Sequence, residues 1–201
     1  MNSQEAIEHL RQDASIRPLL SVIEVPDFTP SGRIYYDLLE SIVSQQLSVK
    51  VADVIFKRFI SLFPDQYPHP EQLIGIDFDK LRSVGLSNQK ANYLQNVARF
   101  TIEHDLESVD WRQKSDAEII SLLTQIKGVG TWTVQMLLMF SMGRPDIFPV
   151  DDLGIQQAMQ RLFKIEAQNP RLLKKQMEVF AEPWRPYRTY ACRYLWRWKD
   201  Q

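Results

Sequence analysis

The chain has 201 residues, of which 44% are hydrophobic and 24% charged, and its formal net charge at pH 7 is -1. This composition is typical of a globular protein, and no apolar run is long enough to predict a transmembrane helix. The single cysteine, Cys192, excludes an internal disulfide and a cysteine-bound cluster, and the three histidines are scattered, so we expect a reducing intracellular compartment and no built-in metal centre.

Apolar residues recur every three or four positions through most of the chain, and this spacing predicts amphipathic helices. We expect helices at about 34–47, 51–63, 78–84, 88–100, 119–126, 132–140, 153–163, 172–180 and 186–198. No stretch alternates convincingly between apolar and polar residues, and the VIEV segment near Val22 is too short to count as a strand. The sequence therefore predicts an all-α fold.

Several of these helices carry capping residues at their ends. Pro64 ends the second predicted helix, and Gly85 is a suitable C-cap for the third. Ser87 is a suitable N-cap for the fourth helix. Ser115 and Glu118 have the spacing of a capping box, which predicts that the fifth helix begins there.

The chain has no linker rich in proline, glycine or serine, and the loop at 143–149 is the natural break in its second half. We expect two helical lobes. One comprises residues 33–144 and includes a helical hairpin at about 115–141. The other comprises residues 1–32 together with residues 145–201.

Two glycines turn the chain between the predicted helices at 119–126 and 132–140. The backbone N–H groups at the start of the second helix lie at its positive end and suit an anion such as a phosphate. The candidate contacts are Lys127, Gly128, Val129, Gly130 and Thr131. The alternative is a tight turn between helices that binds nothing.

Asp151 and Asp152 come directly before the predicted helix at 153–163. Either residue could be the N-cap, and this structural role is the alternative to a chemical one. A carboxylate in this place is kept ionised by the helix dipole and by N–H donors. It could therefore stabilise positive charge that develops beside it during a reaction.

The end of the chain is basic and aromatic. From Arg171 onward it has eight basic and three acidic residues, a net charge of +5, which leaves -6 for the rest. Such a segment can face nucleic-acid phosphates. A solvated helix face explains the charge equally well, and core packing is the alternative reading for each tryptophan, including Trp184 and Trp198.

Taken in order, five segments resemble the helix-hairpin-helix DNA glycosylases of base excision repair. They are QQLS (45–48), GLSNQKANYL (85–94), the hairpin (123–133), PVDDLG (149–154) and WRPYRTYACRYLW (184–196). The Asp-Asp-x-x-Ile pattern at 151–155 resembles the 3-methyladenine DNA glycosylase II branch. The resemblance implies a two-lobed helical fold with an active-site cleft between the lobes.

The resemblance also implies an activity, which is hydrolysis of the bond between deoxyribose and an alkylated purine such as 3-methyladenine or 7-methylguanine. In this branch the second aspartate is catalytic, so the role falls to Asp152, with Asp151 as a supporting carboxylate or cap. The chemistry fits, because breaking this bond builds positive charge on the sugar.

Further roles follow from the same resemblance. Trp132 and Trp196 match two tryptophans of the family's base pocket, and Met136 replaces a tyrosine found in some relatives. Gln46 and Leu47 are candidates for the wedge that fills the vacated base stack, and the alternative is a helix junction in which Leu47 is buried.

Relatives that also cut the DNA backbone use a lysine two residues after the last hairpin glycine. This chain has Trp132 there, which implies a monofunctional hydrolase with water as the nucleophile. No cofactor is expected, although the family implies a loosely held alkali cation between the hairpin backbone and a DNA phosphate.

The expected partner is double-stranded damaged DNA, bound by a monomer without a membrane. The expected compartment is the cytoplasm of a bacterium or the nucleus of a eukaryote. Two alternatives stay open at this point: a glycosylase for other damaged bases, and a non-catalytic helix-hairpin-helix module that binds DNA.

Overall fold

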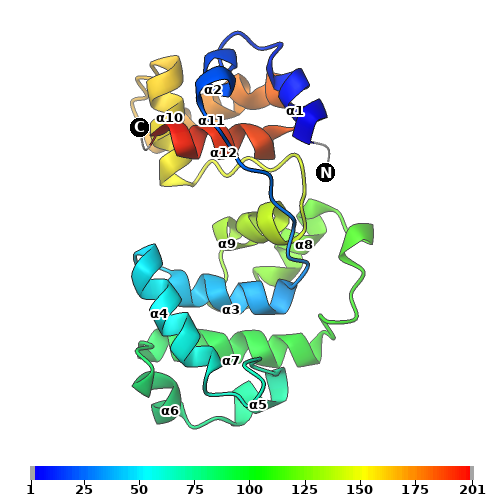
Figure 1. Cartoon of the computed structure of the whole chain (residues 1–201), viewed down its shortest axis with the longest axis vertical. Helices are drawn as coiled ribbons and strands as arrows, with labels where there is room; N and C mark the ends of the chain where they lie inside the picture. Colours follow the sequence, from blue (N-terminus) through cyan, green and yellow to red (C-terminus); the bar gives the residue numbers. More distant parts are fainter. Residues whose placement is uncertain (1–2, 200–201) are drawn as a thin grey trace. The chain divides into compact units, whose positions relative to one another are not determined.

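The computed structural model describes residues 3–199, and these form helices and loops without a β-strand (Figure 1). The predicted all-α class is confirmed. The described part of the chain divides into two compact units. The hairpin unit comprises residues 31–137, and the terminal unit comprises residues up to Pro30 together with those from Leu138 onward. The second division falls between Leu137 and Leu138, inside the helical segment at 131–141, whereas the sequence led us to expect it after residue 144.

The hairpin unit is built around one long helix. Its elements are α3 (Ile34–Ser44), α4 (Val49–Ile60), α5 (Pro70–Gly75), α6 (Phe78–Ser83), α7 (Asn88–Glu103), the 3-10 turn η1 (Trp111–Gln113), α8 (Asp116–Leu123) and α9 (Thr131–Met136). The central helix α7 packs against α3, α5 and α6, and Figure 1 shows it running alongside α3. Fully buried leucines from the two helices, Leu38 and Leu94, lie in this core.

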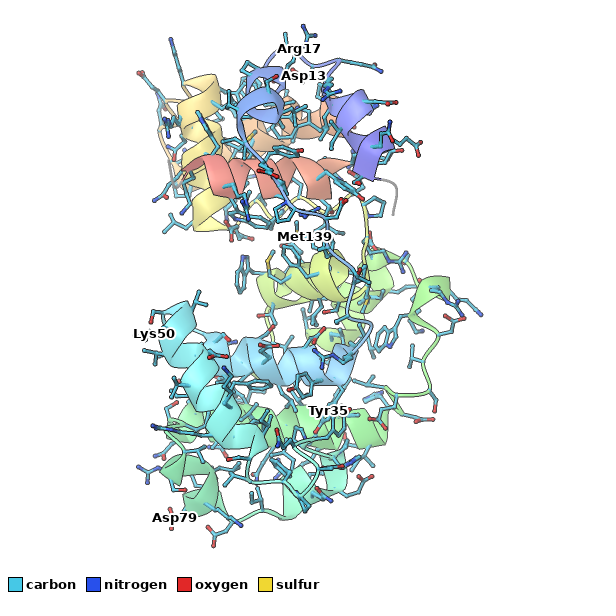
Figure 2. The ribbon with its side chains drawn as sticks, viewed as in Figure 1. Asp13, Arg17, Tyr35, Lys50, Asp79 and Met139 are labelled. Atoms are coloured by element: carbon cyan, nitrogen blue, oxygen red, sulfur yellow. The ribbon has the colours of Figure 1, made fainter. Side chains whose placement is uncertain are left out.

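The terminal unit surrounds the last helix of the chain. Its elements are α1 (Ser3–Leu10), α2 (Arg17–Val22), the π-helical turn η2 (Leu137–Ser141), whose first residue still belongs to the hairpin unit, α10 (Leu153–Phe163), α11 (Pro170–Ala181), the 3-10 turn η3 (Glu182–Trp184) and α12 (Arg188–Lys199). Helix α12 packs against α1, α2 and α10. Trp184 is completely buried, and its indole N–H donates to Asp13 at 3.0 Å, in the turn where Figure 2 shows Asp13 beside Arg17.

The predicted N-caps agree with the structure, but the two predicted ends do not. Helix α4 ends at Ile60, four residues before Pro64, and the C-cap of α6 is Val84, with Gly85 following it at a φ of +103°. The Ser87 hydroxyl accepts the N–H of Lys90 at the start of α7. Ser115 and Glu118 form both halves of the capping box of α8. Asp152 caps α10 by accepting the N–H of Ile155.

Several predicted boundaries are wrong. Helix α3 ends at Ser44 and not at 47, and α8 ends at Leu123 and not at 126. After α8 the apolar pattern continues to Ile126, which is buried in the following turn, whereas after α3 it continues to Leu47, which is exposed. An apolar residue at the helical spacing is therefore not proof that the helix reaches it. Three short helices, α1, α2 and α5, escaped prediction because six to eight residues hold too few turns to establish a period.

Candidate active site

Asp152 is the carboxylate around which the terminal unit's candidate site is built. It precedes α10, and its Oδ1 accepts two hydrogen bonds at 2.8 Å, one from the backbone N–H of Ile155 and one from Nε1 of Trp196. The side chain is half-buried. The two hydrogen bonds restrict the rotation of the carboxylate, so its position is set by two different elements, α10 and α12.

Gly154 makes room for this arrangement. A Cβ at this position would lie 3.0 Å from Cδ1 of Trp196 and 3.1 Å from Oδ1 of Asp152. The alkyl chain of Lys199 also passes here, with Cε 3.3 Å from the same point. A side chain at this position would therefore require the indole or the carboxylate to move by a few tenths of an ångström.

Asp151 is in a different environment. Its side chain is half exposed and forms an ion pair with Lys174 of α11. An exposed pair of this kind contributes little to stability. The structure therefore separates the two neighbouring aspartates: Asp152 bonds to an indole and a helix N-terminus, and Asp151 bonds to a surface lysine.

The indole of Trp196 is the first of three aromatic rings in successive contact. Its ring centroid lies 5.9 Å from that of Phe140, and Phe140 lies 5.7 Å from Phe28 in an edge-to-face contact. Phe140 remains 38% exposed, so part of its ring can contact a ligand. Neither Phe28 nor Phe140 was predicted as a site residue. Phe28 is on a loop without periodicity, and Phe140 carries no local signal that distinguishes it from a core residue.

The loop that carries Phe28 is held by arginines of α12. The Arg193 guanidinium lies 4.4 Å above the Phe28 ring and donates to the carbonyl of Pro26, and Arg197 donates to the carbonyl of Glu24 at 2.9 Å. Burial lowers the pKa of Arg193, which still remains far above neutrality for a guanidinium. These contacts orient Phe28 toward Phe140.

The loop before Asp152 is tied to the start of α12. Arg188 donates to both carboxylate oxygens of Asp146, at 2.6 and 3.0 Å. The Thr189 hydroxyl donates to the carbonyl of Arg144 at 2.7 Å. Much of the basic charge at the end of the chain is thus engaged inside the unit, which favours the structural interpretation of that charge over a phosphate-facing patch. Asp200, counted in that segment, lies outside the described residues.

In the hairpin unit, the glycine turn joins α8 to α9. Gly128 has a φ of +108°, and a Cβ there would overlap the ring of Tyr93. Gly130 precedes α9, and a Cβ there would have no heavy atom within 4 Å. Gly128 is therefore required by the fold, whereas Gly130 leaves an open, exposed stretch of backbone.

The remaining hairpin candidates differ in exposure. Lys127 and Thr131 are exposed and can contact a ligand. Val129 is buried at 5%, and its N–H donates to the carbonyl of Ile126 at 3.0 Å. Val129 thus shapes the turn, and neither its side chain nor its N–H is available for a phosphate.

The turn after α3 presents the two wedge candidates. Gln46 is exposed and has a φ of +58°, which is uncommon for a residue with a side chain. Leu47 is 36% exposed, so the alternative of a fully buried leucine is wrong. Figure 2 shows Lys50 in the first turn of α4, directly after these residues.

The other predicted pocket residues lie on α9. Trp132 is 41% exposed and Met136 is half-buried, one helical turn further along. Trp132 and Met136 belong to the hairpin unit, and Asp152 and Trp196 belong to the terminal unit.

The sequence that carries these residues matches a known protein family. Residues 39–186 match the model of the HhH-GPD superfamily base excision DNA repair proteins. The chain belongs to this superfamily. The resemblance stated from the sequence is confirmed.

Relatives of this chain within the superfamily are named DNA-3-methyladenine glycosylases. The chain is 38% identical over 166 residues to DNA-3-methyladenine glycosylase 1 of Schizosaccharomyces pombe, covering 81% of this chain and 71% of the relative. It is 32% identical over 200 residues to a putative DNA-3-methyladenine glycosylase of Bacillus subtilis, covering 95% of this chain and 69% of the relative. The structure of the S. pombe 3-methyladenine DNA glycosylase in complex with abasic DNA matches with a TM-score of 0.82 at 32% identity, covering 98% of both chains.

This HhH-GPD protein shows no side-chain metal site within residues 3–199, where no three His, Cys, Asp or Glu residues are grouped to hold an ion. An alkali cation would need hairpin carbonyl oxygens. The carbonyls of Lys127 and Gly128 already accept side-chain amide hydrogens from Asn96 and Gln45, at 3.3 and 3.1 Å. Each of these oxygens keeps a second lone pair, which can face a cation or another ligand. Across the same residues, no helix is both long and apolar enough to cross a bilayer.

Cys192 lies close to the candidate site but has no place in its chemistry. The thiol is completely buried, and burial, followed by the negative charge of Asp152, raises its pKa. A protonated, inaccessible thiol is not a nucleophile.

Proposed function

We propose that this protein is a monofunctional DNA glycosylase, which hydrolyses the N-glycosidic bond of alkylated purines such as 3-methyladenine and 7-methylguanine in double-stranded DNA. The observation that carries the proposal is the Asp152 carboxylate, held by Ile155 and Trp196 in a chain of the HhH-GPD superfamily. The names of its relatives support the substrate class.

The reaction needs negative charge beside the sugar. As the bond between C1′ and the base nitrogen breaks, its electron pair leaves with the base, and positive charge develops on the deoxyribose. A fixed carboxylate stabilises this charge where it appears, and a water molecule then adds to C1′ and loses a proton. Because Asp152 is already oriented by two donors, it need not reorganise as the charge forms.

The substrate supplies part of the driving force. Alkylation at N3 or N7 gives the purine a positive charge, which makes it a good leaving group and attracts it to aromatic rings. In the terminal unit, Trp196 and the exposed part of Phe140 offer such rings next to Asp152. Trp132 and Met136 are the base contacts that we assign to the hairpin unit.

We assign DNA binding to the hairpin unit. The exposed backbone at Gly130, with Lys127 and Thr131, contacts a phosphate, and Gln46 or Leu47 fills the space of the extruded base. Trp132 occupies the position of the lysine nucleophile in strand-cutting relatives, so water attacks and no Schiff base forms. One chain carries all of these parts and acts as a monomer.

The experiment is release of bases from DNA treated with a methylating agent. The purified chain is expected to release free 3-methyladenine and 7-methylguanine, detected by chromatography, and to leave abasic sites that break only after alkali. Breakage without alkali would contradict the monofunctional mechanism. If oligonucleotides with oxidised or deaminated bases were cut in preference, the substrate class would be wrong, and if no modified DNA yielded a base, the chain would be a binding module.

A further inference from the structure

One face of α7 contacts both DNA-facing elements of the hairpin unit. Lys90, Tyr93 and Asn96 follow one another at intervals of three residues, so they lie along the same side of the helix. Lys90 and Tyr93 belong to the GLSNQKANYL segment (85–94), which the proposed mechanism leaves without a role.

Lys90 holds the turn after α3. Its ammonium group donates to the carbonyl of Val43 and to the carbonyl of Gln45, both at 2.7 Å. These carbonyls lie at the C-terminus of α3, where the helix dipole favours a cation. The next residue, Gln46, has a positive φ, and such a conformation persists only when its surroundings hold it. Partial burial lowers the pKa of Lys90, which agrees with an ammonium group placed against the backbone.

The same turn is bonded to the hairpin. The side-chain amide of Gln45 donates to the carbonyl of Gly128 at 3.1 Å, and Asn96 of α7 donates to the neighbouring carbonyl of Lys127 at 3.3 Å. The Tyr93 ring lies against Gly128, where it leaves no space for a Cβ. Five contacts therefore connect the end of α3 and its turn, the hairpin and α7.

We propose that Lys90 is a positioning residue for base extrusion, which fixes Gln46 and Leu47 to the glycine hairpin through Gln45 and α7. The inference rests on the proposed function, because it takes the turn after α3 to be the segment that fills the space left in the base stack. Extruding a base costs unstacking energy. Binding of the phosphate to the hairpin can offset this cost only if the wedge residues are held at a fixed position relative to the hairpin, so that both contacts form at the same time. Without Lys90 the hairpin still binds phosphate, but the wedge no longer inserts at a fixed distance from it.

The test compares Lys90→Met with Lys80→Met, which removes an exposed ammonium group of α6 in the same unit. Extrusion is followed by the fluorescence of 2-aminopurine next to an abasic analogue in duplex DNA. We expect Lys90→Met to reduce the extrusion signal and the single-turnover rate of base release by about tenfold, while affinity for undamaged duplex changes by less than about twofold. Lys90→Arg, which can still donate to both carbonyls, should recover most of the signal.

A second variant separates positioning from folding. Gln45→Leu removes the bond to Gly128 and keeps Lys90, and it should reduce extrusion in the same direction, with both variants assayed well below their melting temperatures. If Lys90→Met extrudes the base as well as Lys80→Met, or if Lys90→Met weakens binding to undamaged DNA to the same extent as extrusion, the inference is overturned. Its failure differs from failure of the proposed function, in which the unaltered chain would release no base at all.

Discussion

At Asp152, the helix cap and the catalytic role that we propose fall on one side chain, although the sequence presents them as alternatives. Asp152 caps α10 through Ile155, and it also holds a carboxylate against the indole of Trp196. Because one oxygen, Oδ1, accepts both hydrogen bonds, the cap itself orients the carboxylate. The structural role of the side chain is therefore compatible with the catalytic role that we propose for it.

The close fit at Gly154 gives a test at the scale of one methyl group. Gly154→Ala should reduce the single-turnover rate of base release by about tenfold, because Trp196 or Asp152 must shift by a few tenths of an ångström. Unfolding free energy should stay the same or rise by up to about 1 kcal/mol, since alanine favours the helix. Thermal melts and single-turnover kinetics check both values. The matched control is Gly75→Ala, where a Cβ would meet no atom within 4 Å and activity should not change.

At the scale of elements, the two glycines of the hairpin differ in backbone conformation and in the space around them. Gly128 needs its positive φ and the space that Tyr93 leaves, whereas Gly130 has an ordinary φ of -96° and open surroundings. The fold thus requires the first glycine for the turn, and the second leaves the backbone open to the phosphate that we propose binds there. A Gly-x-Gly pattern alone does not distinguish these two cases.

Alanine at each glycine should separate stability from binding. Gly128→Ala should lower the free energy of unfolding by about 2–4 kcal/mol, from the strained backbone and the overlap with Tyr93. Gly130→Ala should change it by less than about 0.5 kcal/mol, yet weaken binding to duplex DNA because the new methyl group keeps a phosphate from the backbone. Urea unfolding and a DNA titration measure the two effects. Equal loss of stability in both variants would contradict this division.

Helices were predictable where an N-capping residue precedes a long stretch with an apolar period. Helix α7, begun by Ser87, and α8, begun by the Ser115 capping box, are the clearest cases. The change to a π-helical turn at Leu137–Ser141 was not predictable, because its apolar residues fit the α-helical period as well. Helix α5 is too short to show a period at all.

At the scale of the whole molecule, the candidate site could be predicted only where a local motif marks it. Asp152 and the hairpin glycines stand in recognisable segments. Phe28 and Phe140 are 112 residues apart in the sequence (140 − 28), and Gln45 and Gly128 are 83 apart. Such contacts depend on tertiary packing, for which neither periodicity nor charge counting gives a signal. The basic end of the chain shows the same limit, since Arg188 pairs with Asp146 from a distant loop.

The central claim is that the negative charge of Asp152 drives bond cleavage. It is tested by the single-turnover rate of 3-methyladenine release for Asp152→Asn beside Asp151→Asn. Asparagine caps a helix as well as aspartate does, so Asp152→Asn should keep the melting temperature and the affinity for DNA. For Asp152→Asn we expect a rate at least about 100-fold below that of the unaltered chain, and for Asp151→Asn we expect the rate to change by less than about threefold. An Asp152→Asn protein that releases the base at nearly the original rate would contradict this claim.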